Sequence, residues 1–238
     1  MLGRNRSIVL KLSGCLFVVG SFSTLFAGSS LPDCSPGSLA SYIGSTANPP
    51  ATGGCAIGIL DYYNMTYLPG TNAPASSAIG VTPDGQGFSF GPVSAAPGQN
   101  VQFEIDYDIF IDPAPIIGGS RLSLDVNGDI TITEYFCNDS QYIGNGLCLG
   151  SHPAQVLQVG NDNNLPNSAT IIFAQPATTS QQIGIVFNLV GGTNGASFDG
   201  LDSASIVSGV PEPASAGFAL FGLLALAGGY KLKKRHHR

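Results

Sequence analysis

Three acidic side chains alternate with large hydrophobic ones in one short segment of the chain. Glu104, Asp106 and Asp108 are each separated by a single residue. Successive side chains of a strand point to opposite faces, so all three carboxyl groups are expected on one face of a strand at 101–111. Two such carboxyls in a cleft could catalyse glycoside hydrolysis. A solvated outer sheet face is the ordinary alternative. The absence of Trp weakens a sugar-related role, although eight Tyr could supply stacking surfaces.

The residues that other catalytic arrangements require are missing from the central part of the sequence. Between residues 28 and 210 the chain has no Lys and a single His, His152. A Ser-His-Asp triad could be built only around that residue, and the adjacent Ser151 would point to the opposite face of an extended chain. No glycine loop that cradles phosphate is present. We therefore predict that the protein is not an enzyme and assign no catalytic residue.

One segment begins like a calcium-binding loop. Asp125, Asn127 and Asp129 place oxygen ligands at the first, third and fifth positions. Ile130 stands at the sixth position, where Gly is needed, and Phe136 at the twelfth, where an acid is needed. A turn is the better interpretation of this segment. No metal site and no cofactor are predicted, and calcium bound elsewhere is left open without a ligand set.

Four cysteines remain once Cys15 leaves with the N-terminal segment described below. An even number in an exported chain indicates disulfides formed in an oxidising compartment. Three pairings are open, and proximity favours the local ones, Cys34–Cys55 and Cys137–Cys148. Zinc is the alternative, but these spacings lack C-x-x-C pairs and no His lies beside them.

The segments that must position these residues alternate with period two, and none shows a sustained helical period. Arg121–Val126 and Asp129–Thr133 flank Asn127-Gly128, which predicts a type I′ hairpin. Its buried face would carry Leu122, Leu124, Val126, Ile130 and Ile132. Further strands are expected at 56–67, 87–90, 101–111, 154–159, 169–174, 182–190 and 203–207. We predict one all-β domain at 28–209, a β-sandwich with a jelly roll as one arrangement.

Charge is distributed unevenly along the chain. Residues 28–210 contain fourteen Asp and Glu and only one basic residue, Arg121, a net charge of −13. Phosphate binding needs Lys and Arg, so nucleic acid is excluded as a partner. The excess of acid would attract cations, and it also keeps a secreted protein soluble.

The N-terminus has the pattern of a secretory signal. Arg4, Arg6 and Lys11 precede an apolar stretch that ends near Ala27. We expect residues 1–27 to form a signal helix that is removed after Ala27 or Ser29. A weaker alternative is lipidation at Cys15.

The C-terminus combines three features in order. Pro211, Glu212 and Pro213 are followed by an apolar run at 214–230, long enough for a short transmembrane helix. The run ends in basic residues that stay cytoplasmic by the positive-inside rule: Lys231, Lys233, Lys234, Arg235 and Arg238. The proline-rich triplet would form an exposed joint outside the bilayer.

This tail at 210–238 resembles the PEP-CTERM sorting signal of Gram-negative bacteria. The resemblance implies recognition by a membrane-embedded exosortase, cleavage near the Pro-Glu-Pro triplet, and delivery from an inner-membrane precursor to the cell surface or extracellular matrix. It covers about 28 residues and implies nothing about the activity of the preceding domain.

Three functions remain after these observations. The first is a non-enzymatic surface or biofilm-matrix protein with a structural or adhesive role. The second is a module that binds exopolysaccharide through Tyr, carboxylates and amides, which a cleft lined by several Tyr would favour. The third is a secreted hydrolase, which would need two convergent carboxyls about 5 to 9 Å apart.

Overall fold

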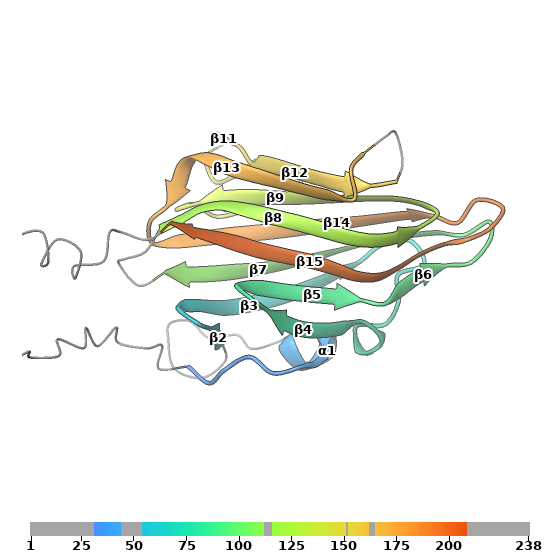
Figure 1. Ribbon diagram of the computed structural model, residues 1–238, viewed down its shortest axis with the longest axis horizontal. Helices are drawn as coiled ribbons and strands as arrows, with labels where there is room; N and C mark the ends of the chain where they lie inside the picture. Colours follow the sequence, from blue (N-terminus) through green and yellow to red (C-terminus); the bar gives the residue numbers. More distant parts are fainter. Residues whose placement is uncertain (1–30, 44–53, 112–115, 151, 162–164, 209–238) are drawn as a thin grey trace, which may run out of the picture.

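The computed structural model describes most of the central domain (Figure 1). The described residues are 31–43, 54–111, 116–150, 152–161 and 165–208. The segments predicted to form a signal helix and a transmembrane helix, the Pro211-Glu212-Pro213 triplet and the basic cluster at 231–238 lie outside them. Within the described ranges, no helix has the length and apolar character required to span a bilayer.

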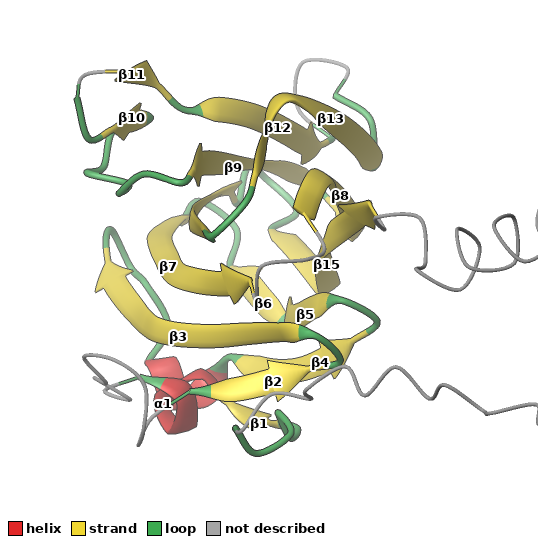
Figure 2. Ribbon diagram, turned by 90° about the vertical axis from the view of Figure 1, so that its left-hand side faces the viewer, coloured by secondary structure: helices red, strands yellow, loops and turns green. Residues whose placement is uncertain are grey.

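Two large antiparallel sheets make up most of the described part of the chain, which confirms the all-β prediction. Sheet A has the order β12-β9-β14-β7-β3-β2, and sheet B has the order β1-β4-β5-β15-β8-β13, with β6 paired to β15. Figure 2, seen along the strands, shows the sheets as two facing layers. The protein is therefore a sandwich, and the narrower jelly-roll arrangement stays a prediction.

The strands have the following bounds. Sheet A contains β2 (Cys55–Ile57), β3 (Leu60–Pro69), β7 (Asn100–Ile111), β9 (Asp129–Asn138), β12 (Gln155–Gly160) and β14 (Ser180–Val190). Sheet B contains β1 (Gly37–Ser38), β4 (Gly80–Asp84), β5 (Gly87–Gly91), β6 (Val93–Ala95), β8 (Ile116–Asn127), β13 (Ser168–Ala177) and β15 (Ala196–Ser208). Outside the sheets lie the short pair β10 (Leu147–Cys148) and β11 (His152–Pro153), helix α1 (Leu39–Tyr42) and the 3₁₀ turn η1 (Ser76–Ala78).

The period-two pattern explains the core. Every second residue of β7, from Val101 to Ile111, is buried, and the residues between them are half-buried or exposed. The rings of Phe103 and Phe187 stack at 4.3 Å between adjacent strands of sheet A. Phe187 also packs on Phe198 of sheet B, with ring centroids 5.8 Å apart. Aromatic contacts of this kind join the two sheets in addition to the area they bury.

The predicted hairpin at Asn127-Gly128 is wrong. β8 belongs to sheet B and β9 to sheet A, so the chain crosses from one sheet to the other at this point. Asn127 stays in β8, paired with Ser197, and only Gly128 between the strands has a positive φ, 89°. A type I′ turn requires a positive φ at both residues. The apolar residues still face the core: Leu122, Leu124, Ile130 and Ile132 are buried, and Val126 is half-buried.

Other expected strands differ in their bounds. The strand expected at 56–67 is interrupted at Gly58, whose φ is 63°, so that β2 and β3 form a tight antiparallel pair. β1, β4, β6, β10 and β11 were not predicted, and all of them are short. Short strands carry too few alternating positions to stand out from loops.

Candidate functional site

The acidic row predicted on one strand face lies on the outer face of sheet A. Glu104, Asp106 and Asp108 project from β7 away from the core, as expected. They are half-buried rather than fully solvated. Ordinary outer-face acids are exposed, so the segments that cover these three decide what they can do.

One cover is the segment that follows β9, here called the arm: residues 139–150 together with β11. The disulfide Cys137–Cys148 fastens the arm to β9, with 5.5 Å between the two Cα atoms. Figure 2 shows β10 and β11 beside β9 and β12, outside the two layers. Cys34–Cys55 is present as well. Both local pairings predicted from the sequence are thus confirmed.

Tyr142 is the arm residue that lies on the acidic row. Its ring stacks on that of Tyr135 from β9, with centroids 5.9 Å apart and planes inclined by 17°. The ring also covers Gly184 of β14, where an added Cβ would come within 2.4 Å of it. Any side chain at Gly184 would displace the tyrosine. Both rings are half-buried, and each keeps part of its surface open to solvent.

Two hydrogen bonds set the position of Tyr142. Its hydroxyl donates to Glu104 Oε1 at 3.1 Å, and its backbone N–H donates to Gln182 Oε1 at 2.6 Å. Gln182 also pairs across the strands with Asp108, where burial raises the pKa of the carboxyl and Gln182 opposes that rise. The tyrosine is therefore held by the same polar groups that it covers.

Burial changes the protonation of the row. The pKa of Asp106 is raised to about 7, first by burial and then by the neighbouring carboxylate of Glu104. Asp106 Oδ1 is buried without a donor among the described residues. Burial of this oxygen and the adjacent carboxylate of Glu104 both favour the protonated form of Asp106. Burial also raises the pKa of Asp108, and bonds from Asn64 and Gln182 oppose that rise.

The other side of the row faces β3, which bulges between Tyr63 and Thr66. Asn64 sits in the bulge with a φ of 52° and donates from Nδ2 to Asp108 Oδ2 at 2.7 Å. Thr66 Oγ1 lies 3.4 Å from Asp106 Oδ2. Bulges commonly re-aim side chains in this way. An amide from each side of β7 therefore contacts Asp108.

A cavity of about 530 Å³ lies at the β2–β3 edge of this sheet. The Cys34–Cys55 segment and three tyrosines, Tyr42, Tyr62 and Tyr63, contribute to its walls. Tyr63 pairs across the sheet with Asp108, so the cavity adjoins the acidic row. Residues 44–53, which connect Ile43 to Gly54, lie outside the described part.

The arm is attached at its root by Asp139, whose φ is 51°. Its carboxylate accepts hydrogen bonds from the backbone N–H groups of Thr178, Thr179 and Ser180, at 2.7 to 3.1 Å, and from both threonine hydroxyls. Burial opposes ionisation, but these donors outweigh it and lower the pKa of Asp139 to about 2. The carboxylate thereby ties the arm to the turn between β13 and β14.

The remaining sequence candidates are not brought together. His152 is exposed on β11. Asp125, Asn127 and Asp129 flank the crossing between the sheets, and the described residues contain no group of three metal ligands. Gln182, Gly184 and Tyr142 were not singled out from the sequence. The Gly- and Asn-rich stretch between Cys137 and Cys148 indicated a loop but gave no sign that it folds back over the sheet.

Comparisons with known proteins add little to this geometry. No protein-family model and no curated protein matches the chain. Among solved structures, the chain is similar to TmCBM61 in complex with β-1,4-galactotriose, at 14% identity and a TM-score of 0.33. The match covers 59% of this chain and 88% of that one. A likeness this weak carries no argument about function, which therefore rests on the residues themselves.

Proposed function

We propose that the protein is a non-enzymatic surface or matrix protein that binds polysaccharide on the outer face of sheet A. One observation carries the proposal: Tyr142 is fixed by a disulfide, by Tyr135 and by Gln182 directly over a row of carboxyl groups. Binding sites for small polar molecules combine aromatic surface with a few placed polar groups. A sugar ring offers an apolar face to the former and hydroxyl groups to the latter.

The arrangement suits an extended ligand. Along the sheet, Tyr63 pairs with Asp108, which pairs with Gln182, and the next row joins Thr66, Asp106 and Gly184. A chain crossing β3, β7 and β14 would meet Tyr63 at one end and Tyr142 at the other. Carboxyl and amide groups between them can accept and donate hydrogen bonds to hydroxyls.

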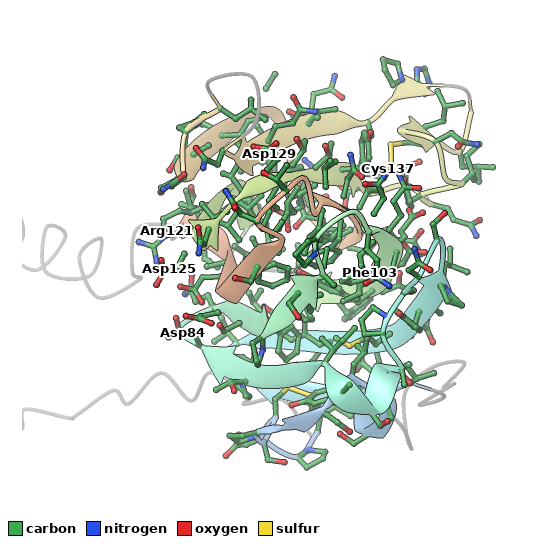
Figure 3. The ribbon with its side chains drawn as sticks, turned by 90° about the vertical axis from the view of Figure 1, so that its right-hand side faces the viewer. Asp84, Phe103, Arg121, Asp125, Asp129 and Cys137 are labelled. Carbon is green, nitrogen blue, oxygen red and sulfur yellow. A yellow bond between two sulfur atoms is a disulfide. The ribbon has the colours of Figure 1, made fainter. Side chains whose placement is uncertain are left out.

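Charge narrows the class of polysaccharide. Of the described residues, only Arg121 and His152 can be cationic, and Arg121 lies on sheet B (Figure 3). In that view Arg121 and Cys137, which marks the arm, are on opposite sides of the molecule. An acidic face repels uronate-rich chains. Neutral chains, or chains with free amino groups, are the ligands that we propose.

The same geometry argues against a hydrolase. Glu104 and Asp106 lie close enough for the carboxylate of Glu104 to raise the pKa of Asp106. Retaining glycosidases keep their two carboxyls about 5 Å apart, and inverting ones keep them farther. Two carboxyls that interact directly leave little room for a glycosidic bond between them, and the Tyr142 hydroxyl already binds Glu104. We propose a binding role for the row.

The two disulfides point to an oxidising, extracytoplasmic location. We further propose that the tail at 210–238 directs the protein through an exosortase to the cell surface or matrix. Mass spectrometry of the native protein tests this proposal. A mature chain ending near Pro211 supports it, whereas an inner-membrane protein that retains its tail through Arg238 as the final form contradicts it.

Binding is tested with the full chain in mild detergent against soluble neutral, amino and uronic polysaccharides, by affinity electrophoresis and calorimetry. We expect binding to the first two classes and a loss of about tenfold or more in Tyr142→Ala. Arg121→Ala, on the opposite sheet, is the matched control and should bind normally. The proposal fails if no neutral or amino polysaccharide binds, or if Tyr142→Ala binds as well as the wild type.

A further inference from the structure

A second acid with an unusual environment lies on the inner side of sheet A. Glu134 of β9 is fully buried between the two sheets. Its Oε1 is hydrogen-bonded to Ser203 Oγ on β15 of sheet B. Its Oε2 has no partner in the described part of the molecule. A buried acid is normally paired with a cation, and none of the described residues supplies one here.

The groups around Glu134 are polar but uncharged. Ser203 is also 3.1 Å from the hydroxyl of Tyr107 on β7, and Tyr62 on β3 donates to Gln86 O at 2.8 Å. Ser120 of β8 lies near Glu134, but its hydroxyl donates to Ala204 O at 3.2 Å. Leu157 and Ile185 flank Glu134 within sheet A.

Among the described residues, no neighbour of Glu134 can neutralise a carboxylate at this position. The titratable groups that face Glu134 are Tyr107 and Tyr62, and burial raises the pKa of both. Both therefore stay neutral in ordinary buffers. Arg121 and His152, the only basic residues in the described ranges, are exposed.

A neutral carboxyl satisfies this site better than a charged one. The protonated group can donate to Ser203 Oγ, which leaves Oε2 as a carbonyl oxygen, a comparatively tolerable group to leave unpaired. An ionised Glu134 would instead be a buried charge with no cation. Burial raises the pKa of Glu134 to about 8, and the nearby serines oppose that rise.

We propose that Glu134 makes the sandwich sensitive to alkaline pH. Its neutral carboxyl connects sheet A to sheet B, and loss of its proton destabilises the fold. The folded protein holds this proton up to about pH 8, whereas the unfolded chain releases it near 4.5. The contribution to stability is therefore complete below about pH 4.5 and is lost as the pH rises through about 8. The state of the surface domain thus follows the pH of its surroundings.

Thermal unfolding of the full chain in detergent tests the proposal, with Glu134→Gln as the isosteric variant that cannot titrate. Between pH 6 and pH 9 the wild type should lose roughly 5–10 °C more in its midpoint than Glu134→Gln. Asp106→Asn controls for the outer acid and should keep most of the wild-type slope. Equal slopes in the wild type and Glu134→Gln would overturn the proposal.

Infrared spectroscopy covers the case in which Glu134→Gln does not fold. In the Asp106→Asn chain, we expect a protonated carboxyl band that persists at pH 7 and disappears near pH 8. A loss of stability over the same pH range supports the proposal. If no protonated carboxyl remains at pH 7, Glu134 is ionised in the folded protein and the proposal is wrong.

Discussion

The two sides of sheet A each hold an acid deprived of water, and their surroundings differ. On the outer side, half-buried Asp106 lies beside the carboxylate of Glu104, which accepts a hydrogen bond from the half-buried Tyr142. On the inner side, Glu134 is fully buried, and its hydrogen bond in the described part of the chain is to the hydroxyl of Ser203. Desolvation favours the neutral form in both places. Asp106 can lose its proton when a ligand provides a hydrogen-bond donor in its place. Glu134 can lose its proton only with a loss of folding stability.

This contrast predicts that the two sides can be altered separately. Changes that displace the Tyr142 ring should lower ligand binding in addition to any loss of stability they cause, whereas changes at Glu134 should alter stability without altering binding. The four predictions below test that separation.

The largest effect is expected from removing the Cys137–Cys148 disulfide in the double variant Cys137→Ala, Cys148→Ala. It closes a short loop, so its loss should reduce the free energy of unfolding by about 3 kcal/mol. Polysaccharide binding should fall with it, because Tyr142 loses its anchor. Denaturant unfolding and calorimetry measure the two effects.

The double variant Cys34→Ala, Cys55→Ala serves as its control. That disulfide closes a loop of 21 residues, so a similar loss of stability is expected. Because Tyr142 stays in place, its contact with the ligand should survive. If both double variants lose binding equally, the arm has no special role and the separation fails.

Asp139→Ala should have the next largest effect. The substitution removes the acceptor of the hydrogen bonds from Thr178, Thr179 and Ser180 at the root of the arm. A loss of about 1–2 kcal/mol is expected, limited by the exposure of the group. The folded pKa is lowered, so the contribution of Asp139 is complete above about pH 4 and is lost as the pH falls through about 2.

Acid unfolding curves of the wild type and Asp139→Asn check this expectation. Asn cannot titrate but keeps one acceptor oxygen. If the two curves fall in parallel between pH 4 and pH 2, Asp139 does not contribute to acid sensitivity.

Gly184→Ala should separate the two sides most cleanly. The new Cβ would come within 2.4 Å of the Tyr142 ring, so the ring must move off the acidic row. We expect polysaccharide binding to fall about tenfold and the free energy of unfolding to change by about 1 kcal/mol or less. The neighbouring outward position provides a control, because Val186→Ala alters the same strand and adds no atom beneath the ring. Unchanged binding in Gly184→Ala would show that polysaccharide binding does not depend on the position of the Tyr142 ring.

The sequence predicted the parts of the molecule that depend on local pattern. Alternation along Val101–Ile111 and Gln182–Val190 indicated both strands and their buried faces. Proximity along the chain was enough to pair the four cysteines. The acidic row was placed on one strand face for the same reason.

It did not predict features that depend on distant partners. Asn127-Gly128 has the composition of a hairpin turn, but the flanking strands pair with Ser197 and Val190 instead of with each other. Glu134 lies just beyond the strand expected at 129–133, and its partner Ser203 is 69 residues away. Gly184 has no side chain at an outward position of its strand, and the ring of Tyr142, 42 residues earlier in the chain, fills the space above it. In each case the deciding contact is long-range, and the local composition carries no trace of it.

The smallest effect is expected from Asp106→Asn, which removes the outer proton. The pKa of Asp106 is raised from 3.8 to about 7, so its contribution to stability is complete below about pH 4 and is lost as the pH rises through 7. Because the group is half-exposed, the effect on unfolding should be small. Binding should respond more: the wild type should bind an amino polysaccharide more tightly as the row becomes fully charged between pH 6 and pH 8, and Asp106→Asn should lack that rise. A rise of equal size in the wild type and in Asp106→Asn would mean that titration of the ligand amine controls the pH dependence. If the rise in binding were lost in Glu134→Gln instead, the two sides of the sheet would be coupled.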